Sequence, residues 1–298
     1  MFPERPTPGM LRVYQVDVFT KKALEGNPAA VVPKGAALTP ARMQAIAREM
    51  NLSETAFLMP SSRADIKIRY FTPAGEVALC GHATIASFAV LNDEGILDGG
   101  RAYVETRAGV LPVDVENGMA AGTRVWLGMD DAAWTAPTIS ALTVARVMGV
   151  PVGWVAQSMP LRVSKGDTLF VPLAARAQLT KVELVPARWT KLARSTGLKR
   201  VCAFKLKDER GTRWECRYFA PGVGVWEDPV TGVAHGRIAQ FLLAEGRIGL
   251  GATGAGEQGG GLGRPGVVYT RVSDDRKKTR VFIGGDSVIA LRGVLSSQ

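Results

Sequence analysis

The stretch RYFTP at residues 69–73 occurs a second time, as RYFAP at residues 217–221. Each copy runs into a glycine-containing turn and then into an apolar segment, which begins with CGHA at residues 80–83 and with TGVA at residues 231–234. The turn is three residues longer in the second copy. In both copies, however, the glycine of the apolar segment lies the same number of residues before the next leucine and before the first glycine after that leucine. A repeat of this kind indicates two similar domains within one chain.

The segments that follow the two glycines are apolar on nearly every side. Residues 85–91 and 238–243 place apolar side chains on several faces of a helix, whereas a surface helix keeps one face polar. Such a helix must be buried all round, and the alternation at residues 66–71 predicts strands around it. We therefore expect an α+β fold of two pseudo-symmetric domains, each a strongly curved sheet or barrel wrapped around a central helix.

The repeat also predicts where the domains begin and end. A chain of 298 residues is long enough for two domains, each with its own core. We expect an N-terminal domain over residues 10–128, completed by part of residues 284–298, and a C-terminal domain over residues 129–283. A ligand is expected in the cleft between them.

Composition excludes several classes of protein. Hydrophobic residues make up 46% of the chain and charged residues 21%, as in globular proteins. No apolar segment approaches the length of a membrane span and no signal peptide is evident, so we expect a cytoplasmic protein without a membrane partner. The net charge is +10, but the lysines and arginines are spread along the chain, which favours a basic surface over a nucleic-acid site.

Metal and nucleotide sites have weak signals in this sequence. The three cysteines, Cys80, Cys202 and Cys216, lack CxxC spacing, and two histidines without an HExxH motif give no metal-ligand pattern. The glycine-rich stretch at residues 251–256 lacks the strand-to-helix context and the acidic residue of a dinucleotide site, so we interpret it as a loop. We expect neither a metal nor a cofactor.

Candidate functional residues lie at the starts of the two buried helices. Gly81 and Gly232 would let backbone N–H groups approach a ligand, and two such helix starts facing each other would bind a small carboxylate. Alternatively, each glycine serves only to form a tight turn and has no part in ligand binding. His82 lies beside the first helix start and Asp228 beside the second, while Glu54 precedes an apolar run, where it could act as a general acid or base or lie on the surface.

Several ordered motifs resemble one family. GNPAAV at residues 26–31, NLSETAF at 51–57, CGHAT at 80–84, EDPVTG at 227–232 and the later EQG at 257–259 are similar to those of the PhzF-like family of phenazine biosynthesis isomerases. The resemblance covers nearly the whole chain. It implies a diaminopimelate epimerase-like fold, a homodimer, and a cofactor-free site that moves a proton between carbons of a cyclic carboxylate.

The resemblance also implies roles for individual residues. Glu54 is similar to the acid/base that transfers the proton of trans-2,3-dihydro-3-hydroxyanthranilate, with His82 and Asp228 binding polar groups and assisting the transfer. The implied substrate-binding residues are Asn27, Gly81, Thr231, Gly232 and Val233.

Two departures from the family pattern leave alternatives open. Val233 stands where the phenazine enzyme has a serine, so the substrate can differ. Cys80 opposite Thr231 is similar to the hydroxyproline dehydratase branch of the superfamily, so an epimerase-like enzyme or a dehydratase with Cys80 as its base is the enzymatic alternative. A packed thiol is the simpler interpretation of Cys80. A non-catalytic ligand-binding or interaction module is the third hypothesis.

Overall fold

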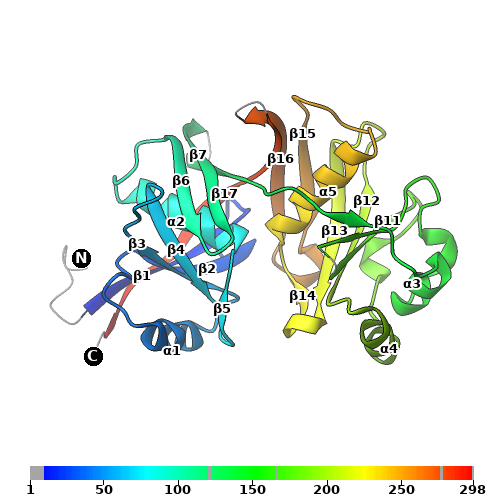
Figure 1. Ribbon diagram of the computed structural model, residues 1–298, viewed down its shortest axis with the longest axis horizontal. Coiled ribbons are helices and arrows are strands. Elements are labelled where there is room, and N and C mark those ends of the chain that lie inside the picture. Colours follow the sequence, from blue (N-terminus) through cyan, green and yellow to red (C-terminus); the bar gives the residue numbers. More distant parts are fainter. Residues whose placement is uncertain (1–9, 120–121, 166, 276–277, 297–298) are drawn as a thin grey trace. The chain divides into compact units, whose positions relative to one another are not determined.

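The computed structural model describes residues 10–119, 122–165, 167–275 and 278–296, and it divides into two compact units (Figure 1). Unit 1 contains residues 1–128 and 284–298, and unit 2 contains residues 129–283. The chain therefore leaves unit 1 after Gly128 and returns to it at Gly284.

Unit 1 is a closed barrel. Its eight strands pair in the order β17-β1-β2-β3-β4-β6-β7-β8, and β8 returns to β17. The pairs β2–β3 and β4–β6 are parallel, whereas the pairs β17–β1, β1–β2, β3–β4, β6–β7 and β7–β8 are antiparallel. The eight barrel strands are β1 (Met10–Val18), β2 (Asn27–Val32), β3 (Thr55–Met59), β4 (Ile66–Phe71), β6 (Gly100–Thr106), β7 (Gly109–Met119), β8 (Gly122–Gly128) and, from Gly284 onward, β17 (Lys278–Ser296). The short strand β5 (Glu76–Val77) also pairs with β4.

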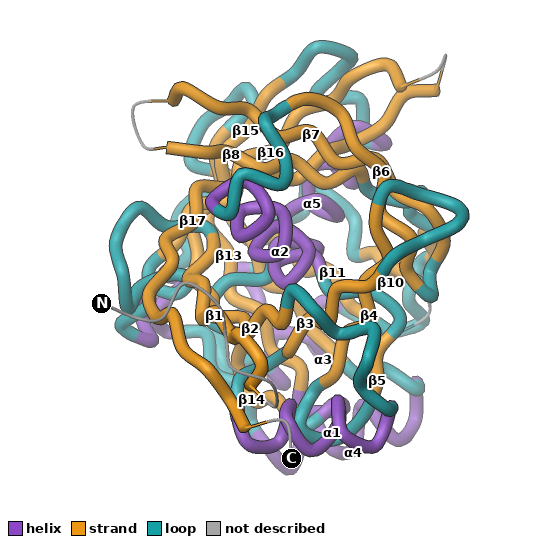
Figure 2. The backbone as a smooth tube through the Cα atoms, turned by 90° about the vertical axis from the view of Figure 1, so that its left-hand side faces the viewer, coloured by secondary structure: helices purple, strands orange, loops and turns teal. Residues whose placement is uncertain are grey.

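Helix α2 (Gly81–Asp93) runs among these strands, as Figure 2 shows. Ten of its thirteen residues are buried, which is why the sequence is apolar on every side of this helix. Helix α1 (Pro40–Met50) instead packs one face against the barrel through Met43, Ile46 and Ala47. Its ends follow the sequence signals, because the Thr39 side chain accepts a hydrogen bond from the Arg42 N–H and Asn51 closes the helix in a left-handed conformation.

Unit 2 repeats this strand pattern. Its main sheet has the order β9-β10-β11-β12-β13-β15-β16, in which β11–β12 and β13–β15 are the parallel pairs. Strand β14 pairs with β13 as β5 pairs with β4. The strands are β9 (Trp134–Thr135), β10 (Arg162–Ser164), β11 (Thr168–Leu173), β12 (Arg200–Leu206), β13 (Arg213–Ala220), β14 (Val225–Asp228), β15 (Thr253–Gln258), β16 (Gly266–Asp275) and the first part of β17.

Two helices of unit 2, α4 (Pro186–Thr196) and α5 (Gly232–Ala244), occupy the same places in the order of elements as α1 and α2 of unit 1. Helix α5 has nine buried residues, including His235 and Phe241, and α4 buries Trp189 and Leu192 in a separate apolar cluster. Helix α3 (Ala141–Val147) joins that cluster. The predicted α+β architecture, two similar units each with a curved sheet around a central helix, is thus confirmed. No helix of the described residues is long and apolar enough to cross a membrane.

The glycine-rich stretch at residues 251–256 is a correction to the sequence analysis. We predicted a loop, but Thr253–Gln258 forms β15 between β13 and β16. Glycines remove the alternation of side chains by which a strand is recognised. They are needed here because a Cβ at Gly256 would lie 2.0 Å from His235 Nδ1 and 2.2 Å from Trp214 Nε1. Gly254 likewise faces the Trp214 ring, at 2.7 Å.

Candidate active site

Glu54 lies directly before β3 and reaches the start of α2. Its backbone oxygen accepts a hydrogen bond from the Ala30 N–H at 3.1 Å, and the parallel pairing of β2 with β3 fixes the chain from Thr55 onward. Its carboxylate Oε2 lies 3.4 Å from Nε2 of His82, the second residue of α2. The Glu54 side chain is 20% exposed and that of His82 is 8% exposed. The pair is therefore largely, but not fully, shielded from water.

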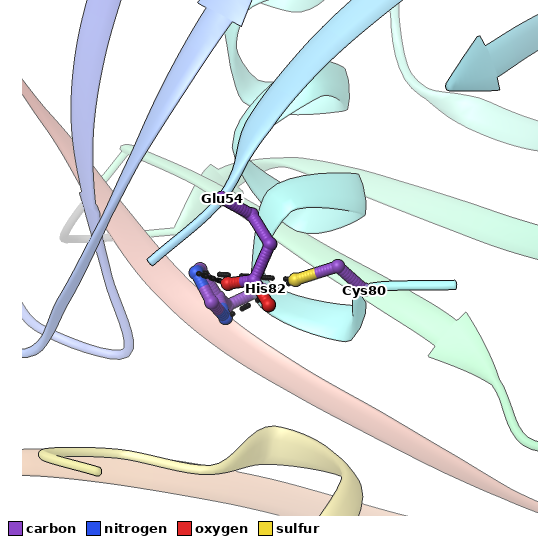
Figure 3. Close-up of side chains that lie close together, drawn as sticks. All are labelled: Glu54, Cys80 and His82. Carbon is purple, nitrogen blue, oxygen red and sulfur yellow. Dashed lines mark hydrogen bonds and ion pairs between the residues drawn. The ribbon is translucent and has the colours of Figure 1, made fainter. Parts of the chain in front are cut away.

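The His82 ring contacts polar groups at both of its nitrogens, as Figure 3 shows for Cys80 and Glu54. Cys80, the N-cap residue of α2, has its Sγ 3.4 Å from Nδ1, and the Ser53 hydroxyl lies 3.3 Å from Nε2. In the neutral tautomer with its proton on Nε2, the ring donates from Nε2 to Glu54 and accepts at Nδ1 from the Cys80 thiol. Transfer of the thiol proton to Nδ1 converts the same contact into a thiolate–imidazolium pair. Both ring nitrogens are thus placed for proton movement.

The Glu54, Cys80 and His82 side chains can also hold a metal ion. One ligand atom from each lies within 4.8 Å of the others, and they are the only such set found among the described residues. Thiolate, imidazole and carboxylate are the usual ligands of Zn²⁺, which takes a tetrahedral arrangement of four. Sequence spacing did not predict this set, because Glu54 comes from a different element and joins the cysteine and histidine only in the folded barrel.

The start of α5 in unit 2 joins one carboxylate, that of Asp228, to a set of hydrogen bonds. The Thr231 hydroxyl donates to Asp228 Oδ2 in a short hydrogen bond. The Gln258 side chain accepts from the Thr231 N–H at 2.9 Å and donates to the Asp228 backbone oxygen at 2.7 Å. Gly232 and the half-buried Val233 then open the helix. Asp228 and the helix start are therefore held as one group.

A family model for phenazine biosynthesis-like proteins, PhzC-PhzF, matches residues 16–293. The chain belongs to this family. It is 32% identical to an uncharacterized isomerase of Clostridium acetobutylicum, covering 95% of this chain and 97% of the relative. It is also 31% identical to the trans-2,3-dihydro-3-hydroxyanthranilate isomerase of Pseudomonas fluorescens, covering 94% and 97%.

The fold comparison agrees with this PhzF-family assignment. The crystal structure of the phenazine biosynthesis protein of the PhzF family from Bacillus anthracis superposes with a TM-score of 0.84 and 27% identity, covering 96% of this chain and 99% of that one. The two units thus have the diaminopimelate epimerase-like fold, and the protein is an isomerase of the PhzF family.

The residues selected from the sequence fall into one group in each unit of this PhzF-family isomerase. Unit 1 brings Glu54 and His82 together beside Gly81, and Asn27 lies buried in the same unit at the start of β2, paired with Val18. Unit 2 brings together the other four, which are Asp228, Thr231, Gly232 and Val233.

Three further residues belong to these groups: Ser53 and Gln258 were not selected from the sequence, whereas Cys80 was named there only as the base of the dehydratase alternative. Ser53 and Gln258 lie inside motifs that carry the family resemblance, so a signal for them was present. Cys80 was interpreted as a packed thiol; it is buried, but its sulfur lies against the His82 ring. That contact gives Cys80 a place in the candidate site.

Proposed function

We propose that this isomerase moves a proton between two carbons of a small cyclic carboxylate. One relative that it resembles is named a trans-2,3-dihydro-3-hydroxyanthranilate isomerase. The observation that carries the proposal is the contact of the Glu54 carboxylate with His82 at a buried helix start. A carboxylate that is oriented by an imidazole and mostly shielded from water is suited to act as a general base on carbon.

The reaction balances without an external oxidant or reductant. Glu54 removes a proton from one ring carbon, and the electron pair spreads over the adjacent double bond and the carboxylate of the substrate. The protonated Glu54 then returns a proton to a second carbon, which shifts the double bond. His82 donates its Nε2–H to Glu54 and keeps the carboxylate oriented between the two steps.

Charge that develops in the transition state needs donors already in place. The first N–H groups of α2 and α5, which begin at Gly81 and Gly232, have no acceptor within their own helices. We propose that both helix starts bind the same substrate, with its carboxylate at these N–H groups, Asn27 binding a polar group, and Asp228 holding a substrate amine or hydroxyl. Val233 supplies no hydroxyl there, which favours a substrate with an apolar group at that point.

Solvent deuterium exchange tests the proposal. Purified protein is incubated in D₂O with trans-2,3-dihydro-3-hydroxyanthranilate and with related cyclic carboxylates, and incorporation at carbon is followed by NMR. We expect Glu54→Gln to slow exchange by about 10²–10⁴-fold, the usual contribution of a general base. Glu49→Gln is the matched control, because Glu49 is exposed on α1 of the same unit, and it should exchange like the wild type.

The same experiment separates the alternatives. The Cys80–His82 contact favours a dehydratase or epimerase as the second candidate, since an imidazole beside a thiol activates it as a base. Exchange that is lost in Cys80→Ala but kept in Glu54→Gln would establish that alternative. Tight ligand binding without exchange in the wild type would instead indicate a binding module and contradict the proposed isomerisation.

A further inference from the structure

Unit 2 contains a buried chain of hydrogen bonds that the proposed reaction does not use. It joins Trp214 of β13, His235 of α5 and Gln258 of β15. Trp214 and His235 are completely buried, and Gln258 is 6% exposed. A buried polar network is retained only when its members are satisfied, so the direction of each hydrogen bond can be worked out.

The direction is set by Trp214. An indole N–H can only donate, and Trp214 Nε1 lies 2.8 Å from His235 Nδ1. Nδ1 must therefore accept, which leaves the neutral ring with its proton on Nε2. Nε2 lies 3.1 Å from Gln258 Oε1, so the Gln258 amide presents its oxygen to the histidine. The Gln258 NH₂ group then faces the opposite side.

The far side of Gln258 is the segment that carries Asp228. The NH₂ group donates to the Asp228 backbone oxygen at 2.7 Å and to the Thr231 hydroxyl at 3.3 Å. Because the Thr231 oxygen accepts there, its own hydrogen is available for the Asp228 carboxylate, to which it donates. The hydrogen bonds thus run in one direction from Trp214 to the Asp228 carboxylate.

The thiol of Cys216 lies beside the chain without forming a link in it. Its Sγ is 3.5 Å from His235 Nε2 and 3.4 Å from Gln258 Oε1. Burial raises the pKa of Cys216 well above its usual value, so it remains a thiol and a weak donor to Gln258. It therefore makes a matched control for substitutions of the chain itself.

The backbone of β15 is built around this chain. Gly256 faces both the indole nitrogen and the histidine ring, and Gly254 faces the indole carbons, at distances that exclude a Cβ. The glycine-rich sequence that superficially resembles a nucleotide loop is thus explained by the room it leaves for Trp214 and His235. Strand β15 lacks a side chain at two positions to allow this close approach, which indicates that the contact with Trp214 and His235 has a specific role.

We propose that Trp214, His235 and Gln258 are positioning residues that hold the Asp228 carboxylate and the start of α5 in the geometry the isomerisation needs. The proposal rests on the role proposed for Asp228. The three side chains reach the reaction only through the segment 228–231, and the tautomer of His235 determines which way Gln258 faces. Loss of the indole N–H is therefore expected to disrupt the whole series of hydrogen bonds from Trp214 to Asp228.

The first test is spectroscopic and needs no substrate. The chain has two histidines, so an untagged His82→Gln protein shows His235 alone in a ¹⁵N spectrum. We expect the Nε2–H tautomer in that protein and a mixture of tautomers once Trp214→Phe is added, because phenylalanine keeps the ring but removes the donor. An unchanged His235 tautomer in the double variant would overturn the proposal.

The second test is kinetic. Trp214→Phe alone should lower kcat by about tenfold, which corresponds to about 1.4 kcal/mol, with KM changed by less than about threefold. Gln258→Met should lower kcat by more, because it removes all three hydrogen bonds to the segment 228–231. Cys216→Ala should stay within about twofold of the wild type on the same scale. An equal loss in Cys216→Ala, or wild-type kcat in Gln258→Met, would show that the chain does not position the site.

These outcomes are distinct from failure of the proposed function. If Asp228→Asn exchanges deuterium like the wild type, Asp228 has no role and the positioning proposal falls with it, whatever the NMR shows. If Asp228→Asn is inactive while Gln258→Met is fully active, the proposed function stands and the positioning role alone is refuted.

Discussion

The two buried helices begin with the same backbone pattern and different chemistry. Helix α2 starts at Cys80-Gly81-His82, where a thiol, an imidazole and the Glu54 carboxylate can all gain or lose a proton. Helix α5 starts at Thr231-Gly232-Val233, where the polar atoms are held in a directed set of hydrogen bonds. The difference fits the proposed function, in which unit 1 would supply groups that exchange protons and unit 2 would supply donors and acceptors held in place.

The fourth residue of each helix shows how the two starts are stabilised. In α2 it is Thr84, whose hydroxyl donates to the Cys80 oxygen at 2.7 Å and contacts the Tyr70 hydroxyl at 2.6 Å. In α5 it is His235, which acts through Gln258 on the segment before the helix. The duplicated scaffold thus fixes both helix starts, but by a local bond in unit 1 and by a longer chain in unit 2.

The largest predicted difference between the two helix starts is in zinc binding, which we expect at the start of α2. Zn²⁺ bound by Glu54, Cys80 and His82 would occupy all three of the titratable side chains gathered at this helix start, so we expect saturating Zn²⁺ to abolish deuterium exchange and a chelator to restore it. Calorimetry should give one site per chain, lost in Cys80→Ser and kept in Cys202→Ser, whose cysteine is buried in unit 2. Full activity of the zinc-loaded protein would contradict the assignment of these groups.

Substitution at the equivalent second position of each helix should have the next largest effect. His82→Gln removes an imidazole that contacts Glu54, and we expect kcat/KM to fall by about 10²–10⁴-fold, as for an acid/base group. Val233→Ala at the same place in α5 removes two methyl groups from a half-buried side chain and should change kcat/KM by less than about tenfold. Similar losses in both variants would remove the distinction between the two starts.

The same contrast explains what the sequence could predict. The repeat and the helices that are apolar on all sides were enough to predict two similar units, each with a curved sheet around a central helix, because a helix buried on every side must be apolar on every side. Strand β15 was mistaken for a loop because its glycines carry no side chains that could alternate. The shape that required those glycines, a tryptophan against a histidine, is a contact between distant elements and leaves no local pattern.

The candidate site divides in the same way. Glu54 and Asp228 could be selected because they stand in motifs that resemble a family, and the structure places Glu54 against His82. The contact of Cys80 with His82 and the contacts of Gln258 with Thr231 depend on side-chain directions that spacing does not determine. That the two groups share one substrate stays a prediction, to be tested by following the Gly81 and Gly232 amide signals during titration with a cyclic carboxylate.

Glycine substitutions in unit 2 should show that β15 depends on its close approach to Trp214 and His235. Gly256→Ala forces a methyl group into the contact between Trp214 and His235, and overpacking of this kind typically costs about 1–3 kcal/mol. Gly260→Ala, in the same unit with open space around its Cβ position, is the control and should leave the melting temperature nearly unchanged. Thermal unfolding of the two variants measures the difference. Equal melting temperatures for Gly256→Ala and Gly260→Ala would mean that β15 shifts to accommodate the methyl group without loss of stability.

The smallest effect is expected from a feature that both units share. Arg69 holds Glu76 through two hydrogen bonds of 2.8 and 2.9 Å, and Arg217 holds Glu227 through two of 2.7 Å. Each arginine also lies over the ring of the phenylalanine two residues later, at 5.1 and 5.0 Å. The ion pair was therefore conserved between the two repeats of this chain while the chemistry at the helix starts diverged.

Removal of the carboxylate should nevertheless cost more in unit 1. Arg69 and Arg107 both lose a partner in Glu76→Gln, for which we expect a loss of about 1–2 kcal/mol of unfolding free energy at neutral pH. Arg217 in Glu227→Gln still donates to the backbone oxygens of residues 179, 180 and 182, so we expect a smaller loss. Urea unfolding at neutral pH measures both, and a larger loss in Glu227→Gln would show that these backbone contacts contribute little.

The pH dependence of Glu76→Gln gives the sign of this interaction. The Arg69 hydrogen bonds hold the pKa of Glu76 below its usual 4.5, so the folded protein releases this proton more readily than the unfolded chain. The stabilisation is therefore fully present above pH 4.5 and is lost as the pH falls through the lowered pKa of the folded state. Unfolding free energies of the wild type and Glu76→Gln should converge over that acidic range. A constant difference down to the lowest pH at which the protein folds would mean that shape at Glu76, and not its charge, accounts for the stabilisation.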